Sequence, residues 1–143
     1  MSIDKLMTRI LALDVGDRRI GVALSDPLGI LASPLTIIER QDDDSDIQSI
    51  INLASKHQVQ KIIVGLPLSM DGMAREQAAK VKSFIQKLEV NFNAPLEYRD
   101  ERLTTVSARR LMESARTKKG KPKQRDDAIA AAIILQSYLD EKQ

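Results

Sequence analysis

Acidic residues stand at three points where the sequence pattern predicts that a strand or a helix begins or ends. Asp14 directly follows an apolar run, and Asp100 and Glu101 follow a short strand-like segment. Asp126 and Asp127 open the last apolar segment of the chain. A carboxylate at the end of a buried strand is unfavourable unless a cation or a hydrogen-bond donor pairs with it. The first question is therefore what these acids bind.

Carboxylates that converge from different elements are typical of a divalent-metal site. Mg²⁺ and Mn²⁺ prefer oxygen ligands, and Mg²⁺ usually takes one or two carboxylates with water and substrate phosphate. Two such ions about 4 Å apart can activate a water and stabilise the leaving oxygen in phosphodiester cleavage. The three acidic positions would converge in this way if the first and last strands lie near the sheet centre and the last helix crosses over them.

Each acid also has a purely structural interpretation. Asp14 precedes a glycine-containing turn, where Asp is common. Asp126 and Asp127 stand in the first turn of a predicted helix, where acids complement the helix dipole. Asp100 and Glu101 could pair with neighbouring arginines. Taken singly these signals are weak, but together they favour a metal site.

Several other chemistries are excluded or disfavoured by the residues present. The chain has no cysteine, so it lacks a disulfide framework and a thiolate zinc site. His57 is its only histidine and lies in a polar stretch, which indicates a surface residue. No glycine-rich phosphate loop follows a strand, and no serine stands in a nucleophile elbow.

Basic residues are concentrated in one part of the chain. Residues 99–125 hold ten Lys or Arg against three acidic residues, although the net charge of all 143 residues is only +2. Such asymmetry favours a polyanionic partner, and the alternative is a solvated face beside a basic loop. We expect nucleic-acid phosphates to contact Arg18, Arg102, Arg109, Arg110, Arg116, Lys118, Lys119, Lys121 and Lys123. With two Tyr, two Phe and no Trp, base stacking is a minor resource.

The hydrophobic pattern predicts one α/β domain over residues 1–143. Strands are expected at 9–15, 19–25, 30–38, 60–66 and 96–99, with Pro34 placing the third at an edge or a bulge. Helices are expected at 45–57, capped by Ser45 or Asp46, and at 73–89, 104–116 and 126–138. An opening meander followed by alternating helices and strands predicts a mixed five-stranded sheet with helices on both faces.

The chain shows no signal for a membrane or for export. No apolar run approaches the roughly 20 residues of a membrane span, and the start MSIDKLMTRI lacks the layout of a signal peptide. We therefore expect a cytoplasmic protein without a membrane partner.

Four segments together resemble the YqgF (RuvX) family. They are LALDVGDRRIGVALSD, IVGLPLSMDG, YRDERLTT and DDAIAAAIILQSYLD, which occur in order and span nearly the whole chain. The resemblance implies a ribonuclease H-like fold related to Holliday-junction resolvases of the RuvC type. It also implies a nuclease that processes the 5′ end of the precursor of 16S ribosomal RNA, with Holliday-junction resolvase as an older description.

Carried over residue by residue, the resemblance assigns the metal ligands. Asp14 is the first, the pair Asp100 and Glu101 supplies the second, with Glu101 favoured, and Asp127, directly before AIAAA, is the third. Asp126 occupies a place where the family pattern often has an apolar residue. Related nucleases carry their second acid on the preceding strand, but here that strand ends Val64-Gly65-Leu66. The expected cofactor is a pair of Mg²⁺ or Mn²⁺ ions, which would activate water to leave a 5′-phosphate and a 3′-hydroxyl.

Three alternatives to an RNA nuclease stay open at this point. The chain could resolve Holliday junctions in DNA, or it could bind nucleic acid without cutting it. A phosphate-handling relative of the actin and sugar-kinase fold is the third, and the length of one domain counts against it. A symmetric four-way junction would call for a homodimer, whereas a monomer suffices for RNA trimming.

Overall fold

The computed structural model describes residues 9–68, 72–119 and 126–142. Its elements in chain order are β1 Arg9–Val15, β2 Arg19–Ser25, β3 Ala32–Glu39, α2 Asp43–Lys56, β4 Val59–Leu66, α3 Gly72–Asn91, β5 Leu96–Asp100, the short 3₁₀ helix η1 Glu101–Leu103, α4 Val106–Lys119 and α5 Asp126–Glu141. The strands form one sheet in the order β3-β2-β1-β4-β5. β1, β2 and β3 pair antiparallel, and β4 pairs parallel to both β1 and β5. The predicted mixed five-stranded sheet is confirmed.

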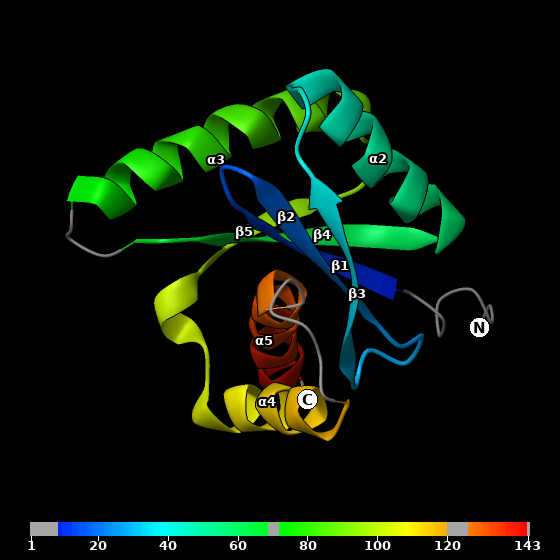
Figure 1. Cartoon of the computed structure of the whole chain (residues 1–143). Coiled ribbons are helices and arrows are strands. Elements are labelled where there is room, and N and C mark those ends of the chain that lie inside the picture. Colours follow the sequence, from blue (N-terminus) through cyan, green and yellow to red (C-terminus); the bar gives the residue numbers. More distant parts are fainter. Residues whose placement is uncertain (1–8, 69–71, 120–125, 143) are drawn as a thin grey trace.

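Helices cover both faces of this sheet (Figure 1). α2 and α3 lie together over one face, α5 crosses the other, and α4 packs outside α5. One apolar core fills the space between the sheet and the pair α2 and α3, and a second fills the space beneath α5. Among the described helices, none has the length and apolar character needed to cross a bilayer.

Side chains of β1 alternate between these two cores. Leu11, Leu13 and Val15 belong to the core on the α2 and α3 side, whereas Ala12 belongs to the core beneath α5. Successive residues of a strand point to opposite faces, so Asp14 lies on the α5 face. The pattern that makes β1 a central strand therefore also aims its one carboxylate at the last helix.

The third strand and the first helix begin at other residues than predicted. β3 starts at Ala32 because the Asp26 carboxylate accepts hydrogen bonds from the amides of Ile30 and Leu31, which holds both residues in a loop. α2 starts at Asp43, since its N-cap is Asp42 and not Ser45 or Asp46. The prediction for Pro34 is confirmed, as β3 is an edge strand with a bulge in its pairing there.

The segment around α4 also differs from the prediction. Helix α4 starts at Val106, and the Thr105 hydroxyl caps it by accepting a hydrogen bond from the amide of Ala108 at 3.1 Å. It continues to Lys119, so Lys118 and Lys119 belong to the helix and not to a loop. The helix is therefore longer than the expected range 104–116 and includes two residues of the basic segment.

Candidate active site

Asp14 and the start of α5 meet at the centre of the sheet. Asp14 pairs in register with Gly21 of β2, and α5 crosses directly over that glycine. A Cβ at position 21 would lie only 1.9 Å from the Asp127 carbonyl oxygen. Because Gly21 has no side chain, the first turn of α5 can rest on the backbone of β2 beside Asp14.

Glu101 reaches the same place from the edge of the sheet. The last strand does not meet the condition of lying near the sheet centre, since β5 is an edge strand and β4 separates it from β1. A glycine in β4, Gly65, leaves room for the Glu101 side chain to reach across β4 toward Asp14. A Cβ at Gly65 of β4 would lie 3.0 Å from Oε1 of Glu101 and 2.6 Å from Cδ1 of Ile134. The Glu101 side chain therefore crosses over β4 at the one position where that strand has no side chain.

The carboxyl groups of Asp14 and Glu101 are hydrogen-bonded to each other. Burial, the negative charges of Glu101 and Asp127, and this hydrogen bond raise the pKa of Asp14 from 3.8 to about 7. Burial also raises the pKa of Glu101, although its hydrogen bond with Asp14 acts in the opposite direction. Asp14 is therefore partly protonated near neutral pH, as a buried carboxyl group beside other carboxylates is in the absence of a cation.

Asp100 is engaged elsewhere. Its carboxylate accepts hydrogen bonds from Nε and Nη2 of Arg102 at 3.0 and 2.8 Å, and from the Arg102 amide at 2.9 Å. The hydrogen bonds from Arg102 lower the pKa of Asp100. Of the two acids that the sequence left as alternatives, Glu101 is the one that touches Asp14, and Asp100 caps η1.

The third predicted ligand, Asp127, influences the acid pair through its negative charge. Asp127 acts electrostatically on Asp14. Over the ranges 9–68, 72–119 and 126–142, no group of three or more Asp, Glu, His or Cys side chains is arranged to hold a metal ion. The structure thus brings two carboxylates into contact and places a third within electrostatic reach. Asp126 opens α5, and its side chain is outside the described part.

Four of the predicted phosphate contacts are exposed on the surface. Arg18 is exposed in the turn between β1 and β2, and Arg102 is 60% exposed directly after Glu101. Arg109 and Arg110 are exposed on α4. The side chains of Arg116, Lys118 and Lys119, and the whole of Lys121 and Lys123, lie outside the described residues.

The two glycines that let the acids meet were missed by the sequence analysis. Gly21 and Gly65 each interrupt an otherwise apolar strand, and such a glycine marks a bulge or a close approach of another segment. Counting back through the first hairpin pairs Gly21 with Asp14, so this signal was available. What passes over Gly65 could not be read from the sequence, because it depends on the order of the parallel strands.

The arrangement of strands and helices is that of the ribonuclease H-like resolvases. RuvC of Thermus thermophilus, solved with a Holliday junction substrate, superposes with a TM-score of 0.59 over 94% of this chain and 96% of RuvC, at 12% identity. The fowlpox virus Holliday junction resolvase gives a TM-score of 0.58 over 94% and 99% of the two chains, at 14% identity. At such low identities these likenesses define the fold.

Sequence comparison identifies the family. A model for RuvX, described as "Holliday junction resolvase", matches residues 8–141. A Desulforamulus reducens protein named "Putative pre-16S rRNA nuclease" is 44% identical over 92% of this chain and 96% of the relative. A Dehalococcoides mccartyi protein of the same name is 49% identical over 89% and 94%. The chain belongs to the RuvX family.

Proposed function

We propose that the chain is a divalent-metal-dependent nuclease that cleaves phosphodiester bonds at the 5′ end of precursor 16S ribosomal RNA. The observation that carries this proposal is the hydrogen-bonded pair Asp14 and Glu101 near the end of the central strand β1. The names of the relatives supply the substrate. Such a substrate would place the protein in the cytoplasm with RNA as its partner, and the chemistry requires no more than a monomer.

The residues present fit a divalent ion. Asp14 and Glu101 offer hard oxygen ligands, and Mg²⁺ commonly takes one or two carboxylates with waters and substrate phosphate. Their repulsion helps to raise the pKa of Asp14, and a bound cation would relieve that repulsion. Asp127 adds negative charge beside them. Mg²⁺ or Mn²⁺ are the expected ions, with Asp127 as the additional ligand that a second ion would need.

The protein's own groups bind and orient the RNA in the reaction. When bound, divalent ions activate water for in-line attack and stabilise the leaving oxygen. Asp14 and Glu101 come from different elements, so the sheet fixes their separation before substrate arrives. Arg102 is exposed and adjacent to Glu101, which suits it to hold the phosphate next to the cleaved bond. Arg109, Arg110 and Arg18 would hold phosphates further away.

A cleavage assay with two substrates tests this proposal. Purified protein is given an end-labelled precursor 16S RNA leader and, separately, a four-way DNA junction, each with Mg²⁺, with Mn²⁺ and with chelator. We expect metal-dependent cleavage of the RNA that leaves a 5′-phosphate. Binding of RNA without cleavage under any metal condition would instead support a non-catalytic binding module.

Resolution of DNA junctions is the second candidate function. The description of the RuvX family model and the fold of the junction resolvases favour it. Symmetric nicking of the junction, together with an intact RNA leader, would establish this activity. A dimer in solution would be expected in that case, because paired cuts on a symmetric junction need two sites.

A further inference from the structure

We propose that Arg40 and Gln77 are positioning residues for Asp14, which they hold in place from the opposite face of the sheet. This inference rests on the proposed function for its effect on catalysis. Arg40 lies between β3 and α2, and Gln77 lies on α3. Their hydrogen bonds to the β1 end and the turn go to main-chain carbonyl groups. Both act on the backbone that follows Asp14.

Two long-range side-chain hydrogen bonds end on consecutive carbonyl groups just after Asp14. Nε2 of Gln77 donates to the carbonyl oxygen of Val15 at 3.2 Å. Nη1 of Arg40 donates to the carbonyl oxygen of Gly16 at 3.1 Å. The parallel pairing of β1 with β4 ends at Leu13, so β4 holds nothing in this last part of β1. β2 still pairs with Asp14 and Val15 on the other side, so the two donors support this segment beyond the end of the β1–β4 pairing.

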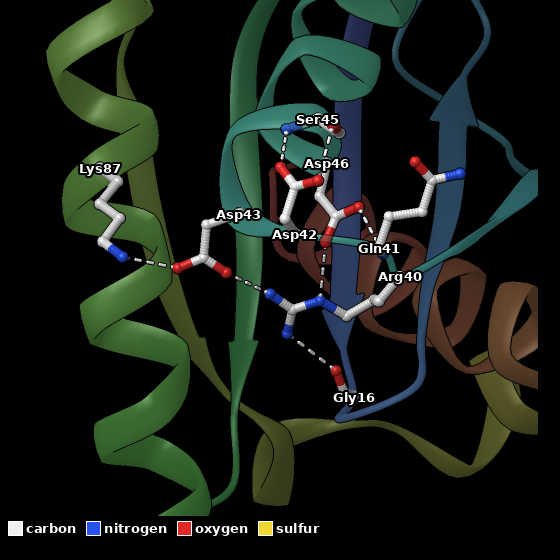
Figure 2. A network of polar contacts seen from close by, with 8 residues as sticks. All are labelled: Gly16, Arg40, Gln41, Asp42, Asp43, Ser45, Asp46 and Lys87. Atoms are coloured by element: carbon white, nitrogen blue, oxygen red, sulfur yellow. Dashed lines mark hydrogen bonds and ion pairs between the residues drawn. The ribbon is translucent and has the colours of Figure 1, made fainter.

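Other contacts hold the guanidinium group of Arg40 that donates to the turn (Figure 2). Its Nε donates to Asp46 at 3.1 Å and its Nη2 donates to Asp43 at 2.9 Å. Asp46 is 2% exposed, and Lys87 pairs with the other oxygen of Asp43 at 2.6 Å. The guanidinium also lies 4.5 Å from the centre of the Phe84 ring. A planar guanidinium can serve all these partners at once, and a lysine ammonium cannot.

Arg40 does more than form ion pairs, because its third side-chain hydrogen bond goes to an uncharged carbonyl group. Asp43 and Asp46 already neutralise Arg40 and tie it to the start of α2. The remaining nitrogen donates to a neutral carbonyl of the β1–β2 turn. The Arg40 amide adds a second link by donating to the carbonyl of Arg18 at 2.9 Å. The turn that follows Asp14 is thus attached to α2 through a single residue.

The two donors also border the same hollow in the surface. A cavity of about 280 Å³ between the turn and α3 is lined by both Arg40 and Gln77, with Asp17, Asp43, Lys80 and Phe84. Here the turn borders open space on its α3 side, so the two hydrogen bonds bridge a gap that packing leaves open. Removing either bond should let the turn move. A misplacement of about 1 Å in a catalytic group can cost on the order of a hundredfold in rate.

The test compares three variants. Gln77→Met removes one donor with little change in size, and Arg40→Lys keeps the charge but loses the planar fork. Lys80→Met is the matched control, because Lys80 lines the same cavity and its ion pair with Asp17 is exposed and long, at 3.6 Å. Amide hydrogen exchange measured by NMR reports on the turn, where the Gly16 amide donates to the Arg19 carbonyl at 2.8 Å. Steady-state cleavage and Mn²⁺ binding by calorimetry report on the site.

We expect Gly16 to exchange about tenfold faster in Gln77→Met and in Arg40→Lys than in wild type or Lys80→Met. We also expect kcat to fall and Mn²⁺ affinity to weaken, each by about tenfold, with KM for RNA unchanged. Unchanged Gly16 exchange in both variants would overturn the proposal, whatever the activity. Faster exchange with wild-type kcat and Mn²⁺ affinity would also overturn it. A wild-type protein that neither cuts RNA nor binds Mn²⁺ would refute the proposed nuclease, and the proposed role in its active site would fall with it.

Discussion

At the scale of single residues, the site is defined by a carboxyl group that is unfavourable in its ionised form. Burial first, and then the charges of Glu101 and Asp127, raise the pKa of Asp14 to about 7. In an unfolded chain the pKa of an aspartate is about 3.9. The folded protein therefore holds a proton on Asp14 between about pH 4 and pH 7, where the unfolded chain does not. Over that range the free energy of unfolding falls as the pH rises.

This pH dependence predicts that Asp14→Asn stabilises the protein. The amide is neutral at every pH and can still donate a hydrogen bond to Glu101. At pH 8 without metal, we expect the variant to have a free energy of unfolding a few kcal/mol larger than wild type, on the order of the pKa shift converted to energy. At pH 5, where Asp14 is protonated, the difference should shrink. Urea denaturation at both pH values in the presence of chelator measures it.

Asp100→Asn is the matched control for that experiment. Arg102 lowers the pKa of Asp100, so the Asp100 carboxylate favours folding at neutral pH and its loss should destabilise the protein slightly. The two variants are therefore expected to differ in sign. If Asp14→Asn were no more stable than wild type at pH 8, Asp14 would not be held in an unfavourable ionised state.

At the scale of elements, the site exists because two glycines let distant segments approach the sheet. Gly21 lies under the first turn of α5, and Gly65 lies under Glu101 and Ile134. An added methyl group would meet backbone at the first position and side chains at the second. Backbone in a buried helix has little room to yield, so Gly21 is the more sensitive position.

We predict that Gly21→Ala destabilises the protein and abolishes cleavage. Its Cβ would lie 1.9 Å from the Asp127 carbonyl oxygen and 2.3 Å from the carbonyl carbon, so the start of α5 must move away from Asp14. Such overpacking typically lowers the free energy of unfolding by about 1–3 kcal/mol. Urea denaturation and the cleavage rate measure the two effects.

Gly72→Ala is the control for this substitution. A Cβ at Gly72 would meet no atom within 4 Å, and the residue begins α3, where alanine is the better helix former. Stability and cleavage should both be retained in this variant. Wild-type cleavage by Gly21→Ala would show that the contact between α5 and β2 does not position the site.

The elements also show how far the sequence alone could predict the structure. The apolar runs in residues 9–15 and 19–25 predict both strands with their correct ends, because a strand that is covered on both faces carries a nearly continuous apolar sequence. The start of α2 was misplaced because Asp42, Ser45 and Asp46 can all cap a helix. Which of them is the N-cap depends on Arg40, whose side chain is hydrogen-bonded to Asp46. The position of β5 at the edge was also missed. Local pattern does not encode the order of parallel strands.

Only part of the candidate site could be predicted, because local pattern marks element ends but not the contacts between elements. The ends of strands and helices mark Asp14, Glu101 and Asp127 as candidates. Which of Asp100 and Glu101 faces Asp14 depends on the turn into η1 and on Arg102, which holds Asp100. The role of Arg40 depends on its hydrogen bond to Gly16 and its contact with Phe84, which are both far from it in the sequence, so local pattern could not indicate it.

At the scale of the whole molecule, the two faces of the sheet have different tasks. The α5 face carries the acid pair, with α4 and its exposed Arg109 and Arg110 packed outside α5. The face covered by α2 and α3 holds the larger apolar core and the residues that brace the turn after Asp14. We therefore expect RNA to approach from the side of α4 and α5.

This division predicts a difference in salt dependence between the two faces. Arg109→Gln and Arg110→Gln should each weaken RNA binding and reduce the slope of log affinity against log salt by about 1. Lys82→Gln is the control, because Lys82 is exposed on α3 over the other face. Fluorescence anisotropy with a labelled RNA at several salt concentrations measures the slopes. Equal effects from Lys82 and from the two arginines would contradict the proposed approach.

The central claim is that Asp14 and Glu101 form the metal-dependent centre of an RNA nuclease. The most direct measurement is the Mn²⁺-dependent cleavage rate of a precursor 16S RNA leader by Asp14→Asn, Glu101→Gln and Asp100→Asn, with RNA affinity measured for each. We predict losses on the order of a thousandfold, or about 4 kcal/mol, for the first two, and at most about tenfold for Asp100→Asn, all with wild-type RNA affinity. Full activity in Glu101→Gln, or a larger loss in Asp100→Asn, would contradict the account.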